Sequence, residues 1–219
     1  HSAFNNQYSI SQMHARFYLF LFLLASCTAF AQTTVTRSLS AFSTIHVSGG
    51  FDEVVLKTGD QESVRLSVSG IDPDRITTDV SEGQLKIGMK KGSYKSFKAR
   101  IVVTYRAIES LSNSGSTDIV TESPIKANSF KLSSSGSGDV KAEFDVQSLK
   151  ISISGSSDMN LKGVADEQQI AISGSGDVNA TQLRGKTADV SISGSGDVEL
   201  NVSGKVKTRV SGSGNVNNN

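Results

Sequence analysis

Apolar and polar residues alternate with a period of two through the second half of the chain. The apolar positions fall four residues before and four residues after each of six similar turns, and Ser, Lys, Asn and Glu dominate the positions between them. Strands with one buried face and one solvent-exposed face show this alternation, so the pattern predicts a strand on each side of every turn. The predicted inward columns are Leu111, Leu132, Ile151, Ile170, Val190 and Thr208 before the turn, Ile119, Val140, Met159, Val178, Val198 and Val216 after it, and a third column, two residues further on, that ends at Asn218.

The six turns are copies of one motif, which reads Ser-Gly-Ser-Gly-Asp in its most regular form. Their first glycines, Gly115, Gly136, Gly155, Gly174, Gly194 and Gly212, are separated by 21, 19, 19, 20 and 18 residues. A period near twenty is the length of one solenoid coil and is too short for a propeller blade. We therefore expect residues 110–219 to form a parallel β-helix, or β-solenoid, with its corners stacked in one column. Glycine at the corner is expected to supply positive φ angles.

Residues 32–109 are rich in predicted strands but less regular. Segments such as Phe42–Val47 and Arg100–Tyr105 alternate, and turn signals separate them. Val47–Asp52 and Val68–Gly70 look like variants of the repeated corner. We interpret this half as wider, less regular β coils that continue into the repeats, so that 32–109 and 110–219 form one continuous all-β domain. A separate small β-sandwich is the alternative.

The N-terminal segment has the pattern of an export signal. An apolar run covers Phe17–Leu24, and Ala29-Phe30-Ala31 is a small-x-small cleavage site. We assign residues 1–31 to an upstream extension plus a signal peptide, with the mature chain starting near Gln32. The alternative is a bacterial lipobox ending at Cys27, which would give a lipid anchor. Free secretion is favoured. In either case we expect an exported protein in the periplasm, at the outer-membrane surface or outside the cell.

Composition and charge narrow the classes of function. The formal net charge is +1, which argues against a nucleic-acid-binding protein because such domains carry a basic excess. The chain has no Trp, 4 Tyr and 20 Gly, which disfavours a compact enzyme. His46 is the single histidine after residue 31, so a histidine-based zinc site or a Ser-His-Asp triad would depend on that residue alone. The sequence therefore predicts no catalytic residue, metal site or cofactor.

Three features together resemble one known family. They are the opening Phe42–Phe51, the segment Gly83–Ile87, and the series of Ser-Gly-Ser-Gly-Asp-Val repeats. With the export signal, they are similar to the putative auto-transporter adhesin, head GIN domain family of bacterial envelope proteins, over about residues 40 to 219. The resemblance implies a β-solenoid and an envelope location. It supplies no catalytic residues to transfer.

The aspartates of the repeated turn are the first candidate for a ligand surface. In a solenoid, equivalent residues of neighbouring coils stack about 4.8 Å apart, and carboxylates at that spacing repel one another unless something compensates. Calcium between the coils is one interpretation. The other is that each aspartate accepts hydrogen bonds from backbone amides of the corner, and we favour it because Asp follows Gly directly. The column contains Asp118, Asp139, Asp158, Asp177 and Asp197.

A run of basic residues is the second candidate. No acidic residue occurs from Gly83 to Ile108. The functional interpretation is a patch for acidic glycans or a phosphate-bearing surface. The alternative, which we favour, is a solvated hairpin whose lysines protect a sheet edge. The seven residues are Lys86, Lys90, Lys91, Lys95, Lys98, Arg100 and Arg106, of which Lys90, Lys91, Lys95 and Lys98 lie in or beside the predicted loop.

Two hypotheses of function follow from these observations. The first is a non-catalytic, adhesin-like binding module that presents repetitive solenoid faces to a glycan or an envelope protein. The second is a carbohydrate-active enzyme, either a polysaccharide lyase or a hydrolase, built on a β-helix. Short loops leave little material for a cleft, and no irregular cluster of acidic and basic residues interrupts the repeat. We therefore favour binding.

Overall fold

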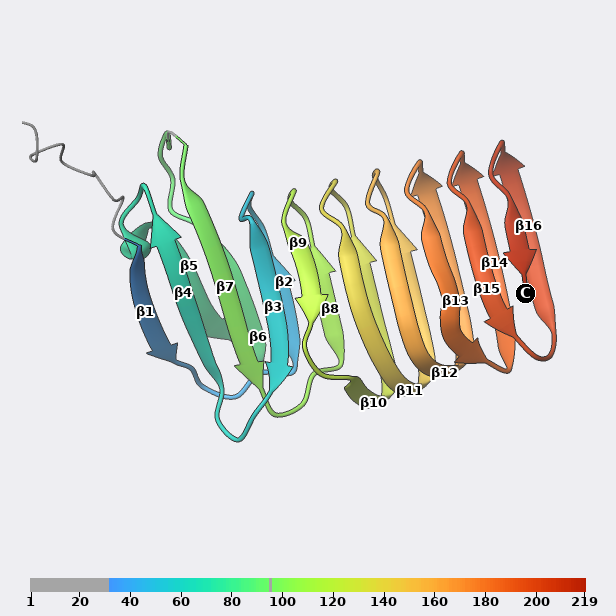
Figure 1. The fold of residues 1–219 in the computed structure, drawn as a ribbon, viewed down its shortest axis with the longest axis horizontal. Coiled ribbons are helices and arrows are strands. Elements are labelled where there is room, and N and C mark those ends of the chain that lie inside the picture. The colour runs from blue at the N-terminus through green and yellow to red at the C-terminus, as the bar shows by residue number, and fades with distance from the viewer. Residues whose placement is uncertain (1–31, 95) are drawn as a thin grey trace, which may run out of the picture. The chain divides into compact units, whose positions relative to one another are not determined.

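A computed structural model describes residues 32–94 and 96–219. This part of the chain consists of strands, turns and a single 3-10 turn at Pro73–Arg75, and it contains no α-helix. The strands form one continuous sheet of 17 strands (Figure 1). They are β1 (Thr33–Ser38), β2 (Thr44–Val47), β3 (Glu53–Thr58), β4 (Ser63–Ser69), β5 (Ile76–Ser81), β6 (Gln84–Met89), β7 (Lys98–Tyr105), β8 (Ser110–Asn113), β9 (Asp118–Thr121), β10 (Ile125–Ser134), β11 (Val140–Ile153), β12 (Met159–Gly174), β13 (Val178–Gly185), β14 (Thr187–Gly194), β15 (Val198–Val202), β16 (Val206–Gly212) and β17 (Val216–Asn218).

From residue 110 onward the chain is a regular parallel stack. One ladder runs β8–β10–β11–β12–β14–β16 and the other runs β9–β11–β12–β13–β15–β17, with every pairing parallel. The longest strands, β11 and β12, pass through the bend opposite the corner and take part in both ladders. The repeated turns line up along the upper edge of the stack (Figure 1). The predicted β-solenoid with aligned corners is confirmed.

The predicted inward columns form the core of this stack. Leu132 pairs in register with Leu111, and the same register continues through Ile151, Ile170 and Val190, all of which are buried. Thr208 and Asn218 are exposed, so the prediction of inward burial is wrong at these two positions. They belong to the last coil, and no described residue lies over them.

Close packing of backbones explains the corner glycines. A Cβ at Gly136 would meet the carbonyl oxygen of Gly115, and a Cβ at Gly155 would meet that of Gly136. The predicted positive φ occurs at Gly194 (149°) and Gly212 (137°) but not at Gly136. Glycine is therefore required mainly because each corner rests directly on the preceding one.

The N-terminal half contains wider coils, as predicted, but they do not stack in chain order. The coil β2–β3 lies between β6–β7 and β8–β9, and it pairs in parallel with both neighbours. The turn at Val47–Asp52 is a true corner, because Gly49 stacks against Gly115. Strands on both sides of residue 110 are thus directly hydrogen-bonded.

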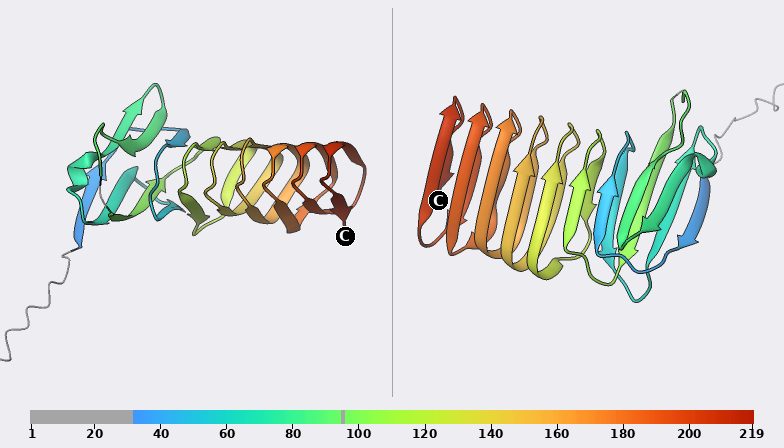
Figure 2. Two further views of the ribbon diagram at one scale, coloured as in Figure 1. Left: turned by 90° about the horizontal axis from the view of Figure 1, so that it is seen from above. Right: turned by 180° about the vertical axis from the view of Figure 1, so that it is seen from behind.

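Antiparallel strands cover this end of the stack. β4 pairs antiparallel with both β1 and β7, and β5 pairs antiparallel with β6. Figure 2 shows these strands splaying away from the two even faces of the regular coils. The prediction that Val68–Gly70 is a stacked corner is wrong, since Val68 and Ser69 end the antiparallel strand β4 and Gly70 lies against Phe97.

The predicted signal peptide and the alternative lipid attachment at Cys27 fall in residues 1–31, outside the described residues. Within the described residues, no helix has the length and apolar character needed to cross a membrane.

Candidate functional site

The aspartate column lies along the corner edge, defined here as the six repeated turns from Ser114 to Asn215. Each carboxylate accepts a hydrogen bond from the backbone amide of the equivalent residue one coil further on. The bonds join Asp118 Oδ1 to Asp139 N (3.0 Å), Asp139 Oδ1 to Asp158 N (3.1 Å), Asp158 Oδ1 to Asp177 N (3.0 Å), Asp177 Oδ1 to Asp197 N (2.7 Å) and Asp197 Oδ1 to Asn215 N (2.8 Å).

These bonds give the aspartates a structural role. Hydrogen bonds to an ionised acceptor are stronger than neutral ones, so they offset part of the repulsion between stacked carboxylates. The serine amides of the corner are also occupied, as in the bond from Ser156 N to Gly136 O (3.1 Å). No group of three or more His, Cys, Asp or Glu side chains in residues 32–94 and 96–219 is arranged to hold a metal ion. The amide-capping interpretation of the corner is confirmed, whereas ligand binding by this column stays a prediction.

The basic loop, residues 90–98, stands on the same edge of the molecule. It joins β6 to β7, which pair with β2 and β3 (Figure 1). Asp52, in the corner between β2 and β3, accepts a hydrogen bond from Ala99 N just after the loop (2.6 Å). Lys90, Lys91 and Lys98 are exposed. Lys95 is not among the described residues.

Two aromatic residues fold the basic loop onto the protein. Tyr94 and Phe97 make an edge-to-face contact with ring centroids 6.4 Å apart. The Tyr94 hydroxyl donates to the Lys90 carbonyl (2.5 Å), and Phe97 packs against the core. These rings therefore stabilise the loop.

The basic run is neutralised in part by acids from elsewhere in the chain. Arg100 Nε lies 2.6 Å from Glu53 Oε2 on the neighbouring strand β3. Arg106 donates to both carboxylate oxygens of Glu62, at 2.8 Å each. These hydrogen bonds hold the pKa of Glu62 below its ordinary value. Sequence reasoning missed both acids because neither is close to its partner in the chain.

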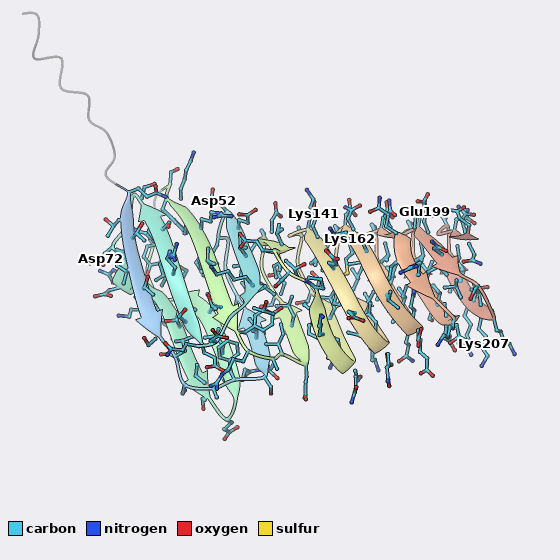
Figure 3. The ribbon with its side chains drawn as sticks, turned by 60° about the horizontal axis from the view of Figure 1, so that its bottom comes forward. Asp52, Asp72, Lys141, Lys162, Glu199 and Lys207 are labelled. Carbon is cyan, nitrogen blue, oxygen red and sulfur yellow. The ribbon has the colours of Figure 1, made fainter. Side chains whose placement is uncertain are left out.

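A groove on one flat face of the regular coils is a third candidate for a binding surface. Its volume is about 340 Å³, and it lies over β9, β11, β12 and β13. Figure 3 labels Lys141 and Lys162 on neighbouring strands of this face. We call it the amide groove, and its lining residues are Val120, Thr121, Lys141, Ala142, Asn160, Leu161, Lys162, Asn179, Thr181 and Gln182.

Polar side chains line up across the amide groove, and one of them, Asn179, is fixed by hydrogen bonds. Lys141, Asn160 and Asn179 follow one another in register across three strands. Asn179 Oδ1 accepts hydrogen bonds from the amide of Thr181 (3.2 Å) and from its hydroxyl (2.7 Å). The register between β12 and β13 shifts beyond Asn160, which marks a β-bulge at the groove.

Charge in the amide groove is positive. Lys162 Nζ is 3.0 Å from Glu143 Oε2. None of the ion pairs in the described part of the chain includes Lys141. Sequence reasoning did not select these residues. The signal that could have found them is the outward column five residues after each first glycine, where Lys141, Asn160 and Asn179 occur in succession.

Comparisons with known proteins agree with this fold. Residues 41–219 match the family described as "Putative auto-transporter adhesin, head GIN domain", so the resemblance seen in the sequence is confirmed. No curated protein matches the chain.

Solved structures with the same fold come from species of Bacteroides and Parabacteroides. A putative adhesin from Bacteroides fragilis NCTC 9343 has 19% sequence identity and a TM-score of 0.74, over 86% of this chain and 97% of that one. A putative lipid binding protein from Parabacteroides distasonis ATCC 8503 has 19% identity and a TM-score of 0.66, over 86% and 96%. A putative adhesin from the same strain has 16% identity and a TM-score of 0.64, over 87% and 98%. Identities this low show a shared fold alone.

Proposed function

Because the chain belongs to the putative auto-transporter adhesin, head GIN domain family, we propose that it is an exported, non-catalytic binding module of the bacterial envelope. We further propose that it holds an acidic glycan in the amide groove. The observation that carries the proposal is the alignment of Lys141, Asn160 and Asn179 across three parallel strands. Polar side chains on this face recur at the strand spacing of about 4.8 Å. An extended glycan that lies across the strands can therefore contact one polar side chain after another.

The chemistry of the groove suits sugar hydroxyls and acidic substituents. Amide side chains both donate and accept hydrogen bonds, and hydroxyls do the same. Lys141 adds positive charge next to them, while Glu143 offsets the charge of Lys162. The lining residues include no aromatic ring, so affinity would come from hydrogen bonds and charge. Binding through exposed charges weakens as salt screens them.

The same lining disfavours the enzyme hypothesis. Most glycoside hydrolases use two carboxyl groups that flank the scissile bond. The lining of the amide groove contains none, and the adjacent Glu143 is paired with Lys162.

Export is supported by the signal pattern in residues 1–31 and by the adhesin description of the family. Fractionation of cells that produce the protein tests export, and a protein retained in the cytoplasm would contradict it.

The test is a glycan array probed with the purified protein at low and high salt. We expect binding to glycans that carry carboxylate or sulfate groups, and none to their neutral counterparts. Lys141→Ala should raise the dissociation constant by about tenfold, the cost of one charged hydrogen bond. Lys150→Ala is the matched control, because Lys150 is an exposed lysine of the same strand, β11, on the other ladder. Equal losses in both variants would contradict the proposed site, and release of new reducing ends from a bound glycan would contradict a non-catalytic role.

A further inference from the structure

The last coil of the solenoid presents two strand edges that differ from one another. β16 is exposed along almost its whole length, and the described residues give it one ladder, with β14. β17 is shorter and pairs with β15.

The end of β15, just beyond its pairing with β17, is closed by a side chain, whereas the N–H of Val216 on the outer edge of β17 stays free among the described residues. Asn218 Oδ1 accepts a hydrogen bond from Val202 N (2.8 Å), and Asn218 Nδ2 donates to Val202 O (2.9 Å). The side-chain amide thus bonds both backbone groups of Val202, as another strand would do.

The edge of β16 has no such closure among the described residues. Ala188 N donates to Lys205 O (3.0 Å), and Ser213 N donates to Gly194 O (3.0 Å). In a parallel ladder, the backbone N–H and C=O groups of alternate residues bond to the same neighbouring strand. The backbone groups that face β14 are therefore those of Lys205, Lys207, Arg209 and Ser211. The N–H and C=O groups of Val206, Thr208 and Val210 point away from it.

The side chains along the edge of β16 indicate what kind of segment could bind there. Val210 is 45% exposed and is the one large hydrophobic side chain exposed in the described part of the chain. Beside it the strand carries Lys207 and Arg209, and Arg209 pairs with Asp189 of β14 (2.9 Å). No acidic residue follows Glu199 in the sequence.

We propose that β16 binds an extended acidic segment of a partner protein by strand addition. The segment would complete the unpaired backbone row, cover Val210 with apolar side chains, and place carboxylates beside Lys207. The proposal is independent of the amide groove. A second copy of the chain fits less well, because antiparallel pairing of two β16 strands about Thr208 sets Lys207 opposite Arg209, and like charges directly opposite one another are unfavourable.

The chain itself provides the probe for this surface. β14 already occupies the other edge of β16, with Asp189 in register with Lys207. A capped synthetic peptide with the sequence of residues 187–194, Thr-Ala-Asp-Val-Ser-Ile-Ser-Gly, therefore offers β16 the same apolar and acidic pattern. We expect a saturable titration in amide NMR spectra of the full chain at millimolar peptide. The largest shifts should occur at Val206, Thr208 and Val210.

Three variants decide the outcome. Thr208→Pro removes an N–H that the β14 ladder does not use, so it should abolish peptide binding while leaving the melting temperature nearly unchanged. Val216→Pro makes the same change at a free N–H of β17 and should leave binding intact. Lys207→Glu should weaken binding by about two- to fivefold, the range of an exposed ion pair, and a peptide with lysine in place of aspartate should reverse that loss. This charge swap remains a test even if Thr208→Pro does not fold.

Other results would overturn the proposal. They are the absence of peptide-induced shifts, shifts that map to another edge, and binding that survives Thr208→Pro in a folded protein. Concentration-dependent self-association that Thr208→Pro abolishes would assign the edge to a second copy instead.

Discussion

The regular coils and the N-terminal end of the stack differ in the order and the direction in which their strands pair. After residue 110, each coil lies on the one before it in chain order, and all pairings are parallel. Before it, the coil β2–β3 is inserted between later segments, and antiparallel strands cover the end. A repeat can propagate with one corner and one register, whereas at the N-terminal end strands that run the other way pair with the open edges of β6 and β7.

The largest expected effect tests the buried columns of the regular coils. Ile151→Asp places a carboxylate where the side chain is fully buried and has no partner. We expect the free energy of unfolding to fall by about 4 kcal/mol or more. Ser152→Asp is the control on the adjacent outward position of β11. Urea unfolding of the two variants compares them. Equal midpoints would contradict the burial of Ile151, and a larger loss for Ser152→Asp would mean that the faces are inverted.

The stacked glycines of the repeated corner can be compared with Gly50, which holds the place of Ser116 in the corner of the inserted coil. A Cβ at Gly155 would meet the Gly136 carbonyl oxygen, while a Cβ at Gly50, in the corner of the inserted coil, meets nothing within 4 Å. Gly155→Ala should therefore cost about 1–3 kcal/mol, as overpacking does. Gly50→Ala should change stability by less than about 0.5 kcal/mol. Thermal and urea unfolding measure both, and similar losses would refute the close stacking of repeated corners.

The aspartate column supplies a smaller effect. Asp158→Ala removes the acceptor of the Asp177 amide, so it should lower stability by about 1 kcal/mol, and Asp158→Asn, which keeps an acceptor oxygen, should cost less. Millimolar calcium should leave the melting temperature of the unmodified protein unchanged. A calcium site would add about 2.7 kcal/mol at a hundredfold excess over its dissociation constant. A calcium-dependent rise that Asp158→Asn removes would make the column a metal site.

The smallest effect belongs to the N-terminal half. Arg106 lowers the pKa of Glu62 from its ordinary value of 4.5, so the ionised form is favoured in the folded protein. The stability from this pair is present above pH 4.5 and is lost as the pH falls through the lower folded pKa. In Arg106→Gln, the free energy of unfolding should therefore decrease less as the pH falls. Urea midpoints from pH 7 to pH 3 test this, and parallel profiles would show that the pair contributes nothing.

The regular coils could be predicted from the sequence because every relevant signal is local. The alternation around Ile151 and Ile170 sets the faces, and the spacing of Gly155 and Gly174 sets the coil length. The position of β2–β3 in the stack could not be predicted. The sequence around Gly49 indicates a corner, but it does not indicate which strands pair with β2 and β3. The amide groove depends on a register shift beyond Asn160, and the pairing of Arg100 with Glu53 depends on that same inserted coil.

The coil β2–β3 separates β6 from β8, and paired cysteines test this arrangement most directly. His46 is in register with both Lys86 and Ser112, so each of these pairs lies one strand spacing apart, about 4.8 Å. Lys86 and Ser112 are then two spacings apart, beyond the limit of about 7 Å between the Cα atoms of a disulfide. In a chain carrying Cys27→Ser, we predict that cysteines at 46 and 86, and at 46 and 112, form disulfides under mild oxidation, and that cysteines at 86 and 112 do not. Rapid formation of the link between 86 and 112 would show that the coils stack in chain order and would contradict the account.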